Sequence, residues 1–432
     1  MTIRMRSATV VVLVVVGSLA SAGSNSADEA AVTIGVKERA SANASIATSG
    51  PFVALAWAAR TKEDVTDVFA ATSRDGGRSF RAPLRVNQTA GDVSVSGEQP
   101  PRVALIPNGA RDPSLVVMWT AKAPSGTRLV SARSTDDGQS FGPAASVPGS
   151  DASGNRGWES MAIGGNGEPV AIWLDHREMA PAAGAGASGQ HQHDAAMQHK
   201  TDGAVAAQLS QIFFARLNDP ASARAIAHGV CYCCKTSVVV AADGTVVAAW
   251  RHVYPGNIRD IALAKSSDGG RSFAPPVRVS EDNWVLDGCP ENGPAVAVDR
   301  THAIHIVWPT LVRDARGGEA LALFYSTSRD GQRFTKRQQV PTEGVPRHPQ
   351  IALGPDGTIT LAWDEQITGA RRVVLARARV SGAADPVRFT REPIADAAGT
   401  YPVLAPLTDG VLVAWTNGPT AGSVLRVAHV PR

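Results

Sequence analysis

The chain has 432 residues, of which 44% are hydrophobic and 19% are charged, with 42 Lys and Arg against 39 Asp and Glu. This composition is too apolar for a disordered chain, and a formal net charge of +3 gives no electrostatic footprint for nucleic acid. With only four cysteines, a fold built on disulfides is excluded. We therefore expect a large hydrophobic core and no nucleic-acid partner.

Residues 1–22 have the pattern of a secretory signal peptide. Arg4 and Arg6 precede an apolar run over residues 8–19, and a small-residue cleavage site ends at Ala22. No later apolar stretch is long enough to cross a membrane. We expect the mature chain to be exported to the periplasm or the medium, where thiols oxidise unless a metal or a partner protects them.

The remainder of the chain is a repeat. Seven short apolar runs, too short for helices and rich in β-branched residues, each end in a tryptophan and are separated by Gly, Pro and Asp, which indicates strands. These tryptophans are Trp57, Trp119, Trp173, Trp250, Trp308, Trp363 and Trp415. The longest interval contains an insertion at residues 179–205. Each interval has room for four strands, which in the fifth unit are 295–298, 304–308, 321–326 and 334–340.

A four-stranded antiparallel unit repeated without helices is typical of a β-propeller. We therefore predict an all-β fold in a single domain over residues 31–432, with seven blades and a six-bladed ring as the alternative. The last unit, from Tyr401, has only three strands before the chain ends. We expect residues 31–36 to supply its fourth strand and so to close the ring.

A second motif recurs between the third and fourth strands of a unit. Its form is S-x-D-x-G-x-S-F at residues 73–80, 134–141 and 266–273, and 328–334 is a version one residue shorter. The motif resembles the Asp box of bacterial neuraminidase repeat (BNR), sialidase-like propellers, and the resemblance covers essentially the whole mature chain. The aspartates, which we expect to stabilise hairpin turns rather than to act in catalysis, are Asp75, Asp136, Asp268 and Asp330.

Alternating strand directions put the Asp-box turns on one face of a propeller, and the connections between blades on the opposite, top face. Function is expected on the top face. The four cysteines fall in two neighbouring connections of that face: Cys231, Cys233, Cys234 and Cys289. His176 and His252 follow the second strands of blades three and four, so they should lie close to the cysteines.

The cysteines have more than one interpretation. A disulfide from Cys289 to one of the other three would join neighbouring blades. Thiolate, imidazole and thioether ligands together suit copper(I) or zinc, and in a mixed state one bridge coexists with two thiols that bind metal beside His176 or His252. The insertion adds four further candidate ligands in a low-complexity tract, namely His191, His193, Met197 and His199.

The resemblance implies a different kind of site. A sialidase holds the substrate carboxylate with three arginines and attacks with a tyrosine that a glutamate activates. Tyr401 looks like this nucleophile, Arg251 looks like one of the arginines, and Arg347 lies where another could stand. The early arginine of the family is missing, and Val240 and Ala241 occupy the segment where the glutamate is expected.

Other polar residues are also expected on the top face, among them Glu159, Asp175, Glu291 and His348. Our leading hypothesis is a non-enzymatic protein that binds copper or zinc through the Cys/His cluster. One alternative is an exo-sialidase or related glycoside hydrolase that uses Tyr401 and Arg251. Another is a propeller that binds a glycan or a protein partner and whose cysteines form ordinary disulfides.

Overall fold

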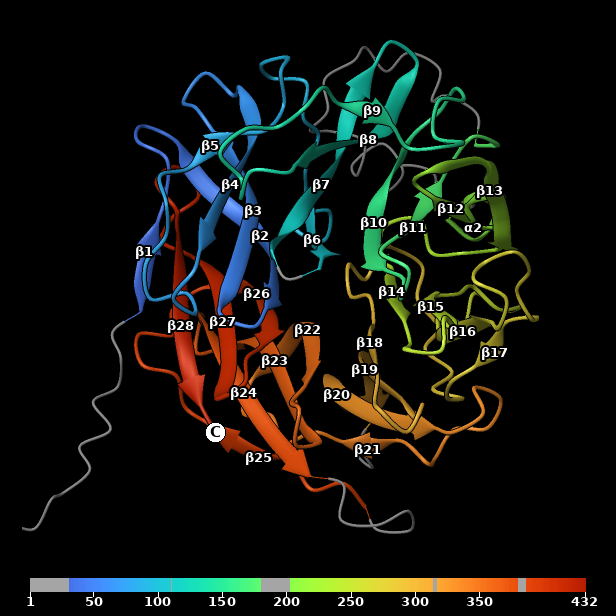
Figure 1. Cartoon of the computed structure of the whole chain (residues 1–432). Helices are drawn as coiled ribbons and strands as arrows, with labels where there is room; N and C mark the ends of the chain where they lie inside the picture. Colours follow the sequence, from blue (N-terminus) through green and yellow to red (C-terminus); the bar gives the residue numbers. More distant parts are fainter. Residues whose placement is uncertain (1–30, 110, 180–202, 314–316, 380–385) are drawn as a thin grey trace, which may run out of the picture.

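The computed structural model describes residues 31–109, 111–179, 203–313, 317–379 and 386–432. Seven four-stranded antiparallel sheets stand in a ring around a central axis (Figure 1). The predicted seven-bladed β-propeller is confirmed, and the six-bladed alternative is wrong. The expected signal peptide and the ligands at 191–199 lie outside the described residues. None of the helical segments in the described part of the chain has the length and apolar character that crossing a bilayer requires.

The blades follow one another along the chain, and the first strand of each is innermost. Blade 1 comprises β2 (Ala40–Ser49), β3 (Phe52–Arg60), β4 (Thr66–Ser73) and β5 (Leu84–Arg85). Blade 2 comprises β6 (Arg102–Asn108), β7 (Arg111–Ala123), β8 (Gly126–Ser134) and β9 (Ala145–Ser146). Blade 3 comprises β10 (Arg156–Ile163), β11 (Pro169–Asp175), β12 (Gln211–Arg216) and β13 (Asp219–His228), with helix α2 (Gly203–Leu209) before β12.

The second half of the ring repeats this order. Blade 4 comprises β14 (Ser237–Val240), β15 (Val246–Arg251), β16 (Ile261–Ser266) and β17 (Val277–Arg278). Blade 5 comprises β18 (Ala295–Val298), β19 (Ile304–Arg313), β20 (Glu319–Ser328) and β21 (Gln338–Gln339). Blade 6 comprises β22 (Val345–Leu353), β23 (Thr358–Ile367), β24 (Ala370–Arg379) and β25 (Thr390–Glu392). Blade 7 comprises β26 (Thr400–Pro406), β27 (Gly410–Asn417), β28 (Val424–Pro431) and β1 (Val32–Ile34).

Blade 7 is completed by the N-terminal strand. β1 pairs antiparallel with β28, with Ile34 opposite Leu425, so strands from both ends of the described chain lie side by side (Figure 1). Each innermost strand contacts the innermost strand of the next blade, and β26 contacts β2. The predicted closure by residues 31–36 is therefore confirmed.

The tryptophans that mark the repeat lie in the second strands and are at most 1% exposed. A second strand is buried on both faces because it packs against the blades on either side: Leu55 of β3 shares a cluster with Leu412 of β27, and Val170 of β11 shares one with Trp250 of β15. Burial on both faces explains why these strands read as continuous apolar runs without alternation.

The Asp-box turns connect the third and fourth strands. In the first of them Asp75 Oδ1 accepts hydrogen bonds from Ser73 Oγ at 2.7 Å and Ser79 N at 2.9 Å, and Gly77 has a φ of 87°. The Asp-box turns include residues that the sequence analysis assigned to the fourth strands, so these strands are shorter than expected. In blade 5 the strand expected at 334–340 is only β21, because Thr335 N still bonds back to Thr327.

Candidate functional sites on the top face

The first strand of each blade starts at the face that carries the connections between blades, the top face. Two clusters of functional side chains lie there. The axial site consists of residues from the innermost parts of blades 6 and 7, and the cysteine site lies in the connections on either side of blade 4.

Four innermost strands share a bulge near their top ends. In β2, β10, β22 and β26 the register against the second strand shifts by one extra residue. A non-glycine residue with φ between 52° and 56° lies in each bulge: Asn43, Trp158, His348 and Tyr401. Bulges re-aim side chains, and left-handed residues persist where the surrounding structure holds them, so these four positions are candidates for functional residues.

Two of these residues meet at Asp364 of β23. Asp364 Oδ1 accepts hydrogen bonds from His348 Nδ1 at 2.6 Å and from the backbone N–H of Tyr401 at 3.1 Å. The His348 and Tyr401 rings lie 4.1 Å apart between centroids. Because a carboxylate only accepts, the His348 proton sits on Nδ1, and Nε2 is the nitrogen that can exchange a proton with a ligand.

The Tyr401 hydroxyl is held in its protonated form. Burial, together with the charges of Asp364 and Glu291, raises the pKa of Tyr401 to about 12. The hydroxyl lies against Gly97, where a Cβ atom would come within 2.0 Å of it. The Tyr401 phenol is therefore protonated at neutral pH and can donate a hydrogen bond, while His348 and Asp364 are buried beside it.

Arg371 lies beside this group, and Arg347 is adjacent to it in the sequence. Arg371 Nη1 is 3.5 Å from Asp364 Oδ2, and its side chain is 31% exposed. Arg347 is adjacent to His348 in β22, and its Nε is buried without a hydrogen-bond partner among the described residues. An arginine donor left without a protein acceptor beside an acid–base pair is suited to an anionic ligand.

Arg251, by contrast, is a structural brace. It is 1% exposed and donates four hydrogen bonds, two to the Asn292 carbonyl, one to the Arg259 carbonyl and one to the Pro309 carbonyl. All three nitrogens of its guanidinium are engaged with main-chain oxygens that join blades 4 and 5. The clamp role that the sialidase resemblance implies for Arg251 stays a prediction.

Glu98 ties the loops around the axis together. It lies in the connection from blade 1 to blade 2 and accepts hydrogen bonds from Lys235 N at 2.9 Å and Gly293 N at 3.1 Å, which belong to connections of blades 4 and 5. Lys235 Nζ in turn donates to the Pro349 carbonyl at 2.6 Å. Burial lowers the pKa of Lys235 to about 8. The carboxylate of Glu98 is thus a connector between loops.

The cysteine site contains one disulfide and two thiols. Cys233 is bridged to Cys289, with 6.2 Å between their Cα atoms, so the bridge joins the connections before and after blade 4. Cys231 and Cys234 are unbridged and buried, and their Sγ atoms are 3.6 Å apart. Cys231 Sγ also lies 3.7 Å from Cys233 Sγ. The structure thus has the mixed state of one bridge and two thiols.

The surroundings of Cys231 favour its thiolate. Arg259 Nη1 donates to Cys231 Sγ at 3.1 Å. The Cys234 thiol, followed by the charge of Arg259, lowers the pKa of the Cys231 thiol, whereas burial raises the pKa of Cys234 well above its usual range. The Arg259 contact and the burial of Cys234 therefore both favour Cys231 over Cys234 as the thiolate of the pair.

The predicted histidine ligands lie near the cysteines but do not join them. Within the described residues, the group whose ligand atoms lie within 4.8 Å of one another consists of Cys231, Cys233 and Cys234. His176 packs against Trp158, which contacts the cysteine cluster, and burial lowers the pKa of His176 to about 4. Its Nε2 has no hydrogen-bond partner among the described residues.

His252 also lies beside the cluster without entering it. Its Nδ1 accepts from Trp250 Nε1 at 3.5 Å, its ring stacks edge-on against Tyr254, and burial lowers its pKa to about 4. Both histidines are thus neutral at pH 7, which is the form that binds metals.

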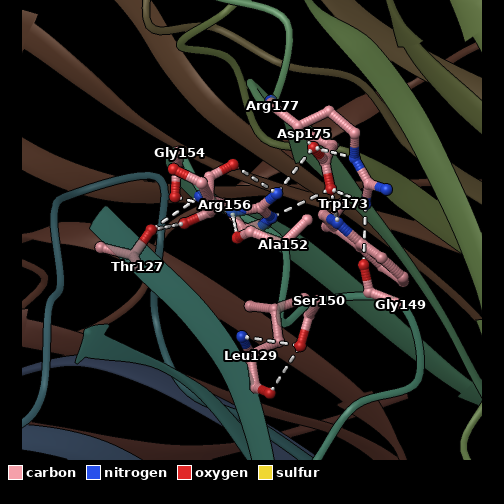
Figure 2. A network of polar contacts seen from close by, with 11 residues as sticks. Thr127, Leu129, Gly149, Ser150, Ala152, Gly154, Arg156, Trp173, Asp175 and Arg177 are labelled. Atoms are coloured by element: carbon pink, nitrogen blue, oxygen red, sulfur yellow. Dashed lines mark hydrogen bonds and ion pairs between the residues drawn. The ribbon is translucent and has the colours of Figure 1, made fainter. Parts of the chain in front are cut away.

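The carboxylate of Asp175, the residue before His176, accepts several hydrogen bonds from neighbouring side chains. Figure 2 shows it accepting hydrogen bonds from Arg156 Nε at 3.1 Å, Trp173 Nε1 at 3.0 Å and Arg177 Nε at 2.9 Å. The network fixes the top end of β11 and therefore the backbone that leads to His176. It leaves the Asp175 carboxylate as a structural anion rather than a ligand.

Several residues of the two sites were not among the sequence-based candidates, notably Asp364, Arg371 and Arg259. A signal for them exists in the chain. Asp364 directly follows Trp363, so it stands where a second strand reaches the top face, and the arginines precede or open third strands, which start at that face. Polar residues at the top end of the second strand and at the start of the third strand are therefore candidates for the top-face sites in every unit.

No protein-family model and no curated protein matches the chain. Solved structures are similar in fold. An ulvan lyase, a polysaccharide lyase bound to -[GlcA(1-4)Rha3S]-, superposes with a TM-score of 0.54 at 9% identity, over 94% of this chain and 95% of its own. An α-L-arabinanase from Penicillium chrysogenum with arabinobiose has a TM-score of 0.50 at 13% identity, over 93% and 98%. A Hadza microbial sialidase has a TM-score of 0.47 at 14% identity, over 85% and 73%. With the seven four-stranded sheets of the ring, the expected likeness to sialidase-like propellers is confirmed as a likeness of fold.

Proposed function

We propose that the protein cleaves an acidic polysaccharide by acid–base catalysis at the axial site. The observation that supports this most is the placement of His348 and Tyr401 in contact, anchored together by Asp364. His348 Nε2 acts as the base, and the Tyr401 hydroxyl acts as the acid that protonates the leaving oxygen. Arg347 and Arg371 bind the carboxylate of the substrate.

This arrangement suits elimination better than hydrolysis. Glycoside hydrolysis uses two carboxyl groups placed on either side of the bond, but Asp364 is engaged by His348 and Glu98 is engaged by backbone N–H groups. A tyrosine nucleophile needs a base on its hydroxyl, whereas Asp364 accepts the backbone N–H of Tyr401. Removal of the proton beside a uronate carboxylate needs one base, one acid and a cation, and these are present.

The fold comparison is compatible with this substrate class. The ulvan lyase, the neighbour with the higher TM-score of those described, has a glucuronate-containing ligand, and the arabinanase has a neutral sugar. The disulfide supports the expected export, because such bridges persist in oxidising compartments. Large extracellular polysaccharides would then be accessible to the protein.

The test is an activity panel with matched variants. Uronate polysaccharides such as alginate, pectate and ulvan are offered beside neutral arabinan and a fluorogenic sialoside, and unsaturated uronate is followed by its ultraviolet absorbance. We expect cleavage of a uronate polymer, and a loss of about 100-fold or more in kcat for both His348→Gln and Tyr401→Phe. His302→Gln, an exposed residue paired with Asp243, is the control and should keep the full rate.

An equal rate in all three variants, or turnover of the sialoside alone, would contradict the proposal. Tyr401→Phe keeps the ring that packs on His348, so its loss of rate cannot be assigned to lost packing.

A second candidate function rests on the cysteine site. We infer that Cys231 and Cys234 can bind one copper(I) ion, since two soft thiolates at 3.6 Å separation are ligands that copper(I) accepts. Zinc fits less well, because a structural zinc site needs four ligands, and Cys233 is occupied by its bridge to Cys289. Neutral His176, which packs on Trp158 beside the cluster, is a candidate for an additional ligand.

Copper(I) titration against a competing chromophoric chelator tests this candidate. We expect one tightly bound ion per chain in the protein with its bridge intact, and loss of that ion in both Cys231→Ser and Cys234→Ser. His302→Gln again serves as the control. Retention of the same tight site in both serine variants would rule out the thiol pair as the ligands.

A further inference from the structure

The four cysteines form a chain of sulfur contacts from the interior of the loop region to its surface. Cys231 and Cys234 are 1% and 2% exposed, whereas Cys289 is only partly buried. Cys231 is the common neighbour, with its Sγ 3.6 Å from Cys234 Sγ and 3.7 Å from Cys233 Sγ. A buried dithiol is therefore in van der Waals contact with a bridge whose far residue, Cys289, is only partly buried.

We propose that these residues are a thiol–disulfide relay, in which the buried Cys231–Cys234 pair exchanges electrons with an external disulfide through the Cys233–Cys289 bridge. This site is independent of the axial site and uses other residues.

The first step is attack of the Cys231 thiolate on Cys233 Sγ. A Cys231–Cys233 bond forms, the Cys233–Cys289 bond breaks, and Cys289 leaves as a thiolate at the more exposed position. One side chain holds both sulfurs of this step in place: Arg259 Nη1 lies 3.1 Å from Cys231 Sγ, and Arg259 Nε donates to the Leu286 carbonyl, in the loop of Cys289, at 2.8 Å.

The second step is attack of Cys234 on Cys231. A Cys231–Cys234 bond forms and Cys233 leaves as a thiolate, while the proton of Cys234 passes to one of the two released sulfurs. One disulfide has been broken and one formed, so the migration itself needs no oxidant. The spacing C-x-x-C of Cys231 and Cys234 suits such a bridge. The thiolate of Cys289, which is only partly buried, then attacks an external disulfide, and Cys233 resolves the mixed disulfide, so that two external thiols are released and the Cys233–Cys289 bridge is restored.

The cleavage sites of trypsin make the position of the bridge directly measurable. Peptide 225–235 carries all three clustered cysteines and peptide 279–300 carries Cys289 alone. The full-length protein, freed of metal with a chelator, is equilibrated with mixtures of reduced and oxidised glutathione, blocked with N-ethylmaleimide, digested and analysed by mass spectrometry. In the starting state the two peptides are cross-linked; after migration, 225–235 has an internal bridge and Cys289 is alkylated.

We expect the wild type to show the migrated form over part of the glutathione range. Cys231→Ser should lose it, because the attacking sulfur is missing. Cys234→Ser should accumulate the intermediate, with Cys231 bridged to Cys233 and Cys289 alkylated. Circular dichroism confirms that each variant is folded.

Two results would overturn the relay. One is a wild type in which the peptides stay cross-linked at every glutathione ratio until the bridge is fully reduced. The other is a Cys234→Ser variant that never yields the Cys231–Cys233 bridge. Because the chelator removes metal in every arm, the outcome does not depend on copper binding, and activity at the axial site is not part of the readout.

Discussion

His348 and Tyr401 adopt backbone conformations that strand residues avoid. Their φ angles of 52° and 53° cost about 1–3 kcal/mol each. Asp364 offsets part of this cost, because its buried carboxylate accepts from both residues. The strained bulges and the shared carboxylate together hold an imidazole and a phenol in contact, which ordinary strand geometry would not do.

Glu159 of β10 makes the stability of the fold depend on pH. It is fully buried, Thr120 Oγ1 donates to its Oε2 at 3.1 Å, and Oε1 has no hydrogen-bond partner among the described residues. Burial raises the pKa of Glu159 to about 7, although Arg102 lies near it. The folded state therefore holds this proton at pH values where the unfolded chain has released it.

Because the pKa of Glu159 is higher in the folded state than in the unfolded chain, its bound proton stabilises the fold fully at pH values below the unfolded pKa. This contribution to the free energy of unfolding is lost as the pH rises through the folded-state pKa of about 7. Glu159→Gln removes this dependence. We expect the variant to gain stability relative to the wild type by up to about 3 kcal/mol between pH 5 and pH 8, measured by urea denaturation of both proteins at both pH values. A difference that stays constant between the two pH values would contradict the assignment.

At the scale of elements, the closing strand β1 is only three residues long, yet it completes blade 7. Ile34 is 6% exposed and packs in the cluster of Leu425 and Val427, whereas Thr33 faces outward. Ile34→Ala should lower the free energy of unfolding by about 2–4 kcal/mol. Thr33→Ala, on the same strand, should change it by less than about 0.5 kcal/mol.

Chemical denaturation measures both variants. Equal effects at the two positions would mean that β1 is not packed as the structure has it.

Strands and their order could be predicted from the sequence because each second strand carries the same signal. A run buried on both faces and ending in tryptophan is repeated seven times, and the Asp-box turns fix where the third strands end. The ends of the fourth strands could not be predicted, because a strand of two paired residues is too short to show an alternating pattern of apolar and polar residues. The pairing of Cys289 with Cys233 was equally hidden, because three cysteines within four positions have indistinguishable spacing and only side-chain direction selects among them.

The candidate site was predictable only in part for a related reason. Tyr401 and His348 were noticed from their positions, but Asp364 sits in a strand from which the sequence offers no contact information. Arg251 has the strand position that the sialidase resemblance favours, and its carbonyl contacts with Asn292 and Pro309 depend on how two blades dock. A repeat pattern in the sequence does not show which residues of neighbouring blades contact each other.

At the scale of the whole molecule, the ring places two chemically different sites on one face. The axial site takes His348 and Tyr401 from blades 6 and 7, and the cysteine site takes its sulfurs from the loops around blade 4. Glu98 connects the loops of blades 1, 4 and 5 across the axis, so both sites rest on the same set of loops. The bottom face carries the Asp-box turns, which stabilise the blades.

If the axial site cleaves a uronate polymer by elimination, the mass of the product distinguishes this reaction from hydrolysis. The protein is incubated with the uronate polymer that it cleaves fastest, and the released oligosaccharides are analysed by mass spectrometry. We expect fragments whose new non-reducing ends are unsaturated, so that no water has been added, and their absence from reactions of His348→Gln and Tyr401→Phe. Fragments that have gained water at each cleavage, or a polymer that stays intact with every uronate substrate, would contradict it.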